Sequence, residues 1–147
     1  HPGVALAAVV GQPDGYAGEL PVAYVQPNQG NQAGAEEMLA FVRQHCPERA
    51  ANPVALHFLA ALPLTAVGKV FKPQLRWDAA RRVVTELLAP LAVDGVGVSV
   101  AVGGDATHGS LATVVLTGRQ GPGREAVEAS VAEILAPFVL RYRLEWH

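Results

Sequence analysis

Lys69 is the residue whose type and setting best fit chemistry on an anionic substrate. It ends residues 62–69, which read LPLTAVGK. In this segment Pro63 fixes the backbone at the entry, Thr65 can bond to the local backbone, and Gly68 permits a tight turn. The lysine then offers one mobile positive charge. Such a loop can bring an ammonium group to a carboxylate or a phosphate and withdraw it again.

The glycine–lysine pair does not belong to a phosphate-binding P-loop. That motif requires a glycine five residues before Gly68 and a serine or threonine after the lysine, but the sequence has Pro63 and Val70 there. A second glycine-rich stretch, residues 95–97, lacks the third glycine of the dinucleotide fingerprint and precedes an expected strand. Taken alone, Lys69 is therefore most simply a solvated lysine in a turn, and its neighbours must decide its role.

No metal site is predicted. The five histidines show no spacing typical of metal ligands, and the single cysteine, Cys46, cannot build a zinc site. The serines lack the context of a nucleophile elbow. Glu36 and Glu37 are most simply helix N-terminal charges rather than a catalytic pair. The histidines are His1, His45, His57, His108 and His147.

The elements expected to hold the lysine loop begin with β-β-α-β. Residues 4–10 and 20–26 predict two strands joined by a turn over 12–15. Residues 35–45 have apolar positions at helical spacing, and residues 54–59 predict a third strand.

The pattern after the loop predicts a helix, two strands, a turn, a helix and a last strand. From residue 54 onward this order matches a ferredoxin-like split βαβ arrangement, and the fold class is α+β. These elements are expected over residues 73–91, 96–102, 111–117, 119–123, 124–136 and 139–146.

Composition limits the partners and the location. The chain has 147 residues, half of them hydrophobic, with a formal net charge of −2 and no basic run, so nucleic acid is not an expected partner. No apolar stretch approaches the roughly 20 residues needed to span a bilayer, so no transmembrane segment is predicted. A single cysteine suits a cytoplasmic protein. Because the chain starts with histidine and has no signal peptide, we expect a piece of a longer polypeptide.

Two segments together resemble the adenylate-forming enzymes, which include acyl-CoA synthetases, firefly luciferase and the adenylation domains of peptide synthetases. Within residues 1–25 the chain reads HPGV, AVVG and PDGYAGELPVAYV, similar to the family's HPxV…AAVVGxPDxxxGExPxAFV stretch. Residues 62–69, with Leu75 and Arg76 following, resemble the family's LPxTxxGK motif. Their order and separation also fit, and the resemblance covers about residues 1–82.

The resemblance implies that residues 1–82 are the small mobile C-terminal lid domain, a mixed sheet with helices. The order of the predicted elements makes residues 83–147 a ferredoxin-like β-β-α-β extension, which we expect to pack on the same domain. The long tail and the continuation VFKPQLR resemble a bacterial fatty acyl-CoA synthetase. The implied partner is the N-terminal domain of the same polypeptide, which would hold ATP, Mg²⁺ and a small carboxylic acid, with CoA as the acceptor. The fragment alone is expected to be inactive.

The resemblance also assigns roles. Lys69 would be the catalytic residue of acyl-adenylate formation, while Pro63, Thr65 and Gly68 would shape its loop. Residues that bind substrate remain unknown. The chain departs from many relatives at residues 50–53, where a Tyr-Lys pair is missing, and at Lys72, where arginine is common.

Two alternatives stay open. The chain could be a non-catalytic ferredoxin-like binding module, because residues 96–147 contain no chemical motif. It could also belong to an adenylation domain that loads a carrier protein rather than free CoA. A phosphate loop upstream of His1 would favour a ligase, and assays with each acceptor would separate the two enzymes.

Overall fold

The computed structural model describes residues 1–118 and 123–147, and these divide into two compact units. Unit 1 contains residues 1–12 and 19–76, and unit 2 contains residues 13–18 and 77–147. Each unit has its own three-stranded sheet and its own apolar cluster, so the α+β class is confirmed. The expected boundary between a lid domain ending at residue 82 and its extension stays a prediction.

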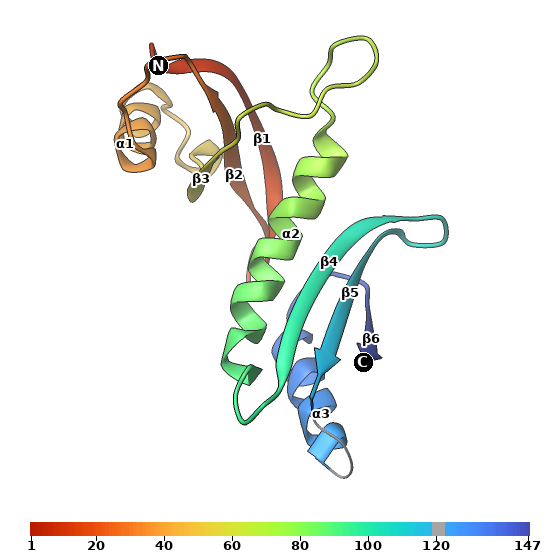
Figure 1. Cartoon of the computed structure of the whole chain (residues 1–147). Helices are drawn as coiled ribbons and strands as arrows, with labels where there is room; N and C mark the ends of the chain where they lie inside the picture. The colour runs from red at the N-terminus through yellow and green to blue at the C-terminus, as the bar shows by residue number, and fades with distance from the viewer. Residues whose placement is uncertain (119–122) are drawn as a thin grey trace. The chain divides into compact units, whose positions relative to one another are not determined.

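The sheet of unit 1 has the order β1-β2-β3, formed by Val4–Asp14, Gly18–Pro27 and Ala55–Phe58. Strands β2 and β3 run parallel, so a crossover must join them. Helix α1, Ala35–His45, is that crossover, and it is followed by a short 3₁₀ turn, Arg49–Ala51. The expected β-β-α-β order and the bounds of α1 are confirmed (Figure 1). The core of unit 1 contains Met38 and Leu39 of α1 with Ala23, Val25 and Leu56 of the sheet.

The turn between β1 and β2 lies later in the chain than the sequence pattern predicts. Strand β1 continues through Asp14, whereas a turn was expected over residues 12–15. Asp14 Oδ1 accepts the backbone N–H groups of Tyr16 (2.9 Å) and Ala17 (2.7 Å), and Gly18 then takes φ of 81°. The two N–H donors also lower the pKa of the Asp14 carboxyl. The side chain of Asp14 therefore sets where the turn begins.

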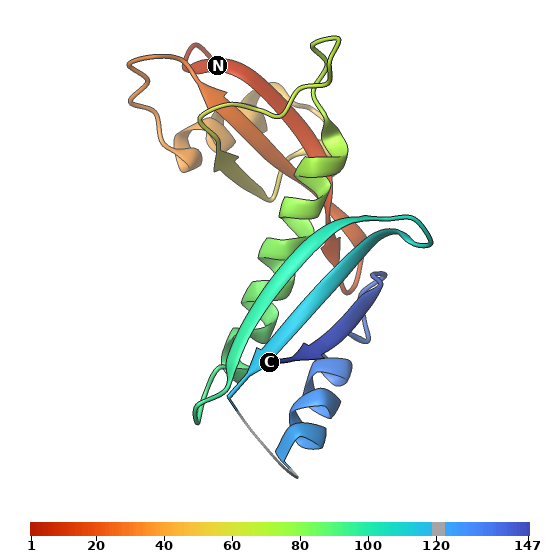
Figure 2. The same ribbon diagram turned by 45° about the vertical axis from the view of Figure 1, so that its right-hand side comes forward.

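Unit 2 has a sheet of order β4-β5-β6 with α3 against one face (Figure 2). Strands β4 and β5 form an antiparallel hairpin, while β5 and β6 are parallel and joined by α3. The expected β-β-α-β order is confirmed, and the turn expected over residues 119–123 lies largely outside the described residues. The elements after the lysine loop are α2, Lys72–Leu88; a 3₁₀ turn, Ala89–Leu91; β4, Gly97–Asp105; β5, Gly109–Thr117; α3, Gly123–Leu135; and β6, Tyr142–Trp146.

One detail of the ferredoxin-like expectation is corrected by the strand pairing. Strand β3 pairs with β2 in unit 1, so it does not join the sheet of β4, β5 and β6. Strand β6 pairs directly with β5, with Ala112 opposite Tyr142, and no strand separates them. The β5-α3-β6 segment is therefore a plain βαβ unit rather than a split one. Pairing depends on contacts between distant segments, which hydrophobic periodicity does not encode.

Alternation along β5 separates a buried face from a partly exposed face. Val114 and Leu116 are fully buried, whereas Leu111 on the other face is half-buried. The buried residues pack with side chains from α2 and α3. That cluster contains Val84, Leu88, Val96, Val114, Leu116, Val127, Val131 and Leu135. Within the described residues, no helix is both long enough and apolar enough to cross a membrane.

Leu116→Ala should destabilise the protein by about 2–5 kcal/mol, because it leaves a cavity in the core of unit 2. Leu111→Ala is the matched control on the same strand, and it should cost clearly less because its side chain points to the other face. Urea unfolding of the two variants measures both costs. Equal losses would show that the two faces of β5 are wrongly assigned.

Candidate functional site

The residues around Lys69 form a tight β-hairpin with a closed neck. Leu64 and Val70 make an isolated antiparallel bridge. The backbone N–H of Phe71 donates to the carbonyl of Pro63 at 2.8 Å. The hairpin lies directly before α2, at the upper right of Figure 1. Its two arms are therefore joined at the base by main-chain contacts, as in a miniature sheet.

Thr65 and Gly68 form the turn that presents Lys69. The N–H of Thr65 donates to the carbonyl of Lys69 at 2.6 Å, and the N–H of Lys69 donates to Thr65 Oγ1 at 3.1 Å. The N–H of Gly68 closes the turn on the carbonyl of Thr65 at 2.9 Å. Gly68 has φ of 80°, a conformation that glycine adopts without steric cost. A turn followed by such a glycine is typical of three-residue hairpin loops.

Buried leucines hold the hairpin at both ends. Leu62 precedes it and is 4% exposed, and Leu75 follows it in the first turns of α2 and is 1% exposed. A side chain of the sheet adds a polar contact, because Gln26 Oε1 accepts the N–H of Leu62 at 3.1 Å. The hairpin therefore projects from a fixed base.

Two residues from separate resemblance motifs meet near the start of α2. Arg76 Nη1 lies 3.2 Å from Glu19 Oε1, although 57 positions separate them in the chain. Both side chains are more than half exposed, so the pair contributes at most about 1 kcal/mol. It still links the first turns of α2, which follow the hairpin, to the beginning of β2.

The Lys69 side chain is exposed and, within the residues described, has no ion-pair partner. The hairpin also exposes apolar side chains: Val67 at the tip is 81% exposed and Leu64 at the neck is 53% exposed. An unpaired ammonium on a closed hairpin can meet a carboxylate or a phosphate that comes from outside the hairpin. The sequence-predicted loop residues Pro63, Thr65 and Gly68 all belong to this hairpin.

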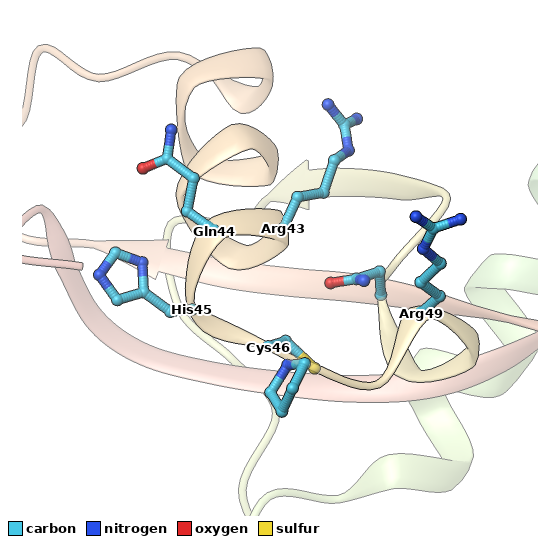
Figure 3. A pocket seen from close by; sticks show the side chains of 7 residues that line it. Arg43, Gln44, His45, Cys46 and Arg49 are labelled. Carbon is cyan, nitrogen blue, oxygen red and sulfur yellow. The ribbon is translucent and has the colours of Figure 1, made fainter.

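A second polar site lies at the C-terminal end of α1. It is an open pocket of about 730 Å³, and Arg43 and Arg49 extend toward the same side of it (Figure 3). Neither guanidinium group has an ion-pair partner in the part of the chain that is described. Two unpaired guanidinium groups suit a phosphate or carboxylate ligand. The full lining is Arg43, Gln44, His45, Cys46, Pro47, Arg49 and Asn52.

Polar groups near these arginines are only partly satisfied. His45 Nδ1 lies 2.8 Å from the carbonyl of Phe41, and its ring stacks on the Phe41 ring at 4.0 Å. Asn52 Oδ1 is buried and has no hydrogen-bond partner among the described residues. Nowhere in the described part of the chain do three or more His, Cys, Asp or Glu residues form a cluster that could hold a metal ion. The pocket therefore offers two cationic donors to a ligand, while the unpaired oxygen of Asn52 is buried beneath its surface.

Sequence reasoning missed Gln26, Arg43 and Arg49. The two arginines flank Pro47 at the end of a predicted helix, and this pairing of basic residues was the available signal. Gln26 gave no signal, because its contact with Leu62 spans 36 positions. Side-chain contacts of that range depend on the parallel pairing of β2 and β3.

Comparison with known proteins connects the hairpin to a family. Residues 1–69 match the model of the AMP-binding enzyme C-terminal domain, and this match ends at Lys69. Marinolic acid–CoA ligase of Pseudoalteromonas sp. (strain SANK 73390) is 37% identical over 134 residues, which cover 91% of this chain and 20% of the relative. Acetyl-coenzyme A synthetase of Methanothrix soehngenii is 39% identical over 102 residues, covering 65% of this chain and 15% of the relative.

The chain spans about a fifth or less of the length of these relatives. Among solved structures, the Brucella canis acyl-CoA synthetase is 37% identical with a TM-score of 0.48, covering 52% of this chain and 14% of that protein. The match to the marinolic acid–CoA ligase is long enough to include most of unit 2, whereas the matched share of the acetyl-coenzyme A synthetase is smaller.

Gly68→Ala should loosen the hairpin by about 1–2 kcal/mol, because alanine resists the left-handed backbone conformation. Beyond Gly68 and its two chain neighbours, no described atom lies within 4 Å of the position that a new Cβ would take, so the cost would come from the local backbone alone. Gly103→Ala is the control, since that site is equally open and has no positive φ. Amide hydrogen exchange at Lys69 should accelerate only in the Gly68 variant; unchanged exchange would show that Gly68 does not hold the turn.

Proposed function

Residues 1–69 belong to the C-terminal domain family of the AMP-binding, adenylate-forming enzymes, and from this premise we propose that the chain is the C-terminal part of an ATP-dependent acid–CoA ligase. The observation that carries the proposal is an unpaired, exposed ammonium on a closed hairpin at the end of the family match. The names of several relatives as CoA ligases or synthetases support CoA as the acceptor. An acyl-carrier protein is the less supported acceptor.

In the first half-reaction, a substrate carboxylate attacks the α-phosphate of ATP and pyrophosphate leaves. Two anions must approach each other, and negative charge builds on the phosphoryl oxygens. The ammonium of Lys69 would lie between them, reduce their repulsion and stabilise the transition state. Because Thr65 and Gly68 fix the turn before any substrate binds, little ordering remains for the moment of reaction.

In the second half-reaction, the thiol of CoA attacks the acyl adenylate and AMP leaves. We propose that this domain rotates between the two steps, so that Lys69 leaves the site and another face replaces it. The pocket with Arg43 and Arg49 is the face best suited to CoA phosphates, because its guanidinium groups are unpaired within the described residues. The assignment of the CoA phosphates to this pocket does not depend on Lys72.

The remaining groups belong to the part of the enzyme outside this chain. The described residues offer no cluster for Mg²⁺, so we assign the ion that normally accompanies ATP to the N-terminal domain. The pocket for the acid, whether a fatty acid or another carboxylic acid, lies there too. A cytoplasmic location stays a prediction from cysteine content. The lid domain of residues 1–82 would supply the hairpin, and residues 83–147 would form its extension.

Lys69→Ala in the full-length enzyme should reduce acid-dependent ATP–pyrophosphate exchange by roughly 10²–10³-fold, because it removes a charge that acts in the transition state. Thioester formation from a supplied acyl adenylate should stay near its original rate. Lys72→Ala, an exposed lysine three residues later, is the control and should spare the exchange reaction. Equal loss in both half-reactions, or in neither, would remove Lys69 from the proposed role.

Arg43→Ala should raise the KM for CoA on the order of tenfold in the thioester reaction, since one charged hydrogen bond is lost. Adenylation should be unaffected, and the Arg43→Ala/Arg49→Ala variant should show a larger rise. Arg141→Ala, an exposed arginine on the other unit, serves as the control. A normal KM for CoA in the double variant would show that CoA binds elsewhere.

A further inference from the structure

We infer that Gln26 is a positioning residue for Lys69 during adenylate formation. This inference rests on the proposed function and adds to it a residue outside both resemblance motifs. Gln26 lies near the end of β2, and its side-chain oxygen accepts the N–H of Leu62 at 3.1 Å. Leu62 stands one residue before Pro63, whose carbonyl closes the neck of the hairpin.

Gln26 continues the pairing of β2 with the chain that leaves β3. Backbone pairing runs from Val22 opposite Ala55 to Val25 opposite Phe58, and the N–H of Leu59 then donates to the carbonyl of Val25 at 2.9 Å. Beyond Leu59 the main chain of β2 makes no further bond to this segment among the described contacts. The side chain of Gln26 takes over, so β2 controls both the exit from β3 and the entry to the hairpin.

Water is a poor substitute for this contact. Leu62 is only 4% exposed. If the glutamine oxygen were removed, the N–H of Leu62 would therefore have no acceptor in its place. A buried N–H without an acceptor is unfavourable, and the segment would shift to find one. Any shift at Leu62 passes directly to Pro63 and to the first arm of the hairpin.

The second arm has its own support and does not depend on Gln26. The N–H of Lys72 donates to the carbonyl of Val70 at 3.1 Å, and the N–H of Gln74 donates to that of Phe71 at 3.2 Å. With this arm fixed to α2, movement of the first arm would tilt the hairpin as a whole. A tilt moves the Lys69 ammonium away from its target without unfolding the domain, and small displacements of a catalytic group reduce rate steeply.

The test compares Gln26→Met, Gln26→Asn and Gln26→Glu in the full-length enzyme. Methionine keeps the length but has no comparable acceptor, asparagine shortens the reach, and glutamate keeps a carboxylate oxygen at neutral pH. Gln26→Met should lower the kcat of ATP–pyrophosphate exchange on the order of tenfold, with KM for ATP nearly unchanged. Gln26→Glu should recover most of this loss, and Gln26→Asn should fall between. Thioester formation from a supplied acyl adenylate should change less than about twofold.

Gln32→Met is the matched control, because Gln32 is exposed and, among the residues described, its side chain bonds to the nearby Gly30 carbonyl alone. The double variant Gln26→Met/Lys69→Ala should be no slower in exchange than Lys69→Ala alone, as expected if Gln26 acts through the lysine. If Gln26→Met does not fold, Gln26→Asn carries the comparison.

Several results would overturn the inference: full exchange activity in Gln26→Met, no recovery in Gln26→Glu, equal loss in both half-reactions, or additive losses in the double variant. Failure of Lys69→Ala to affect exchange would instead remove the proposed function itself. The two failures are therefore distinguishable.

Discussion

The paired hydrogen bonds between Thr65 and Lys69 are the constraint on which the candidate site depends. Each residue donates its N–H to the other, one to a carbonyl and one to a hydroxyl. These bonds restrain the backbone of the lysine while its side chain stays exposed. A long, flexible side chain on a fixed backbone is a suitable device for reaching an anion at a defined place. The glycine and proline contribute by making this geometry accessible.

The hairpin forms through contacts between residues that are close in sequence, but its placement depends on residues that are distant in sequence. Its base is held by two buried leucines and by a glutamine from β2, so the sheet of unit 1 sets where the lysine can point. Unit 2 has a core and a sheet of its own, which suits an extension that folds around its own hydrophobic residues.

The sequence predicts those parts of the structure that depend on neighbouring residues. The pattern Thr-x-x-Gly-Lys identifies a turn, and apolar spacing identifies α1 with its correct bounds. The turn after β1 lies later than the composition of residues 12–15 predicts, because the Asp14 side chain accepts N–H groups from Tyr16 and Ala17. The placement of β3 and the contact of Gln26 could not be predicted, because both depend on which strands become neighbours.

The segment between Leu62 and Leu75 is held together largely by contacts within itself. Most of the bonds at its neck and tip are main-chain to main-chain, and Thr65 supplies a side-chain contact inside it. Ala66 and Val67 are exposed at the tip, and Val67 is 81% exposed. Protein engineers could therefore exchange such tips between related scaffolds, provided that the receiving sheet offers an acceptor where Gln26 stands. The host strand, rather than the loop, would determine compatibility.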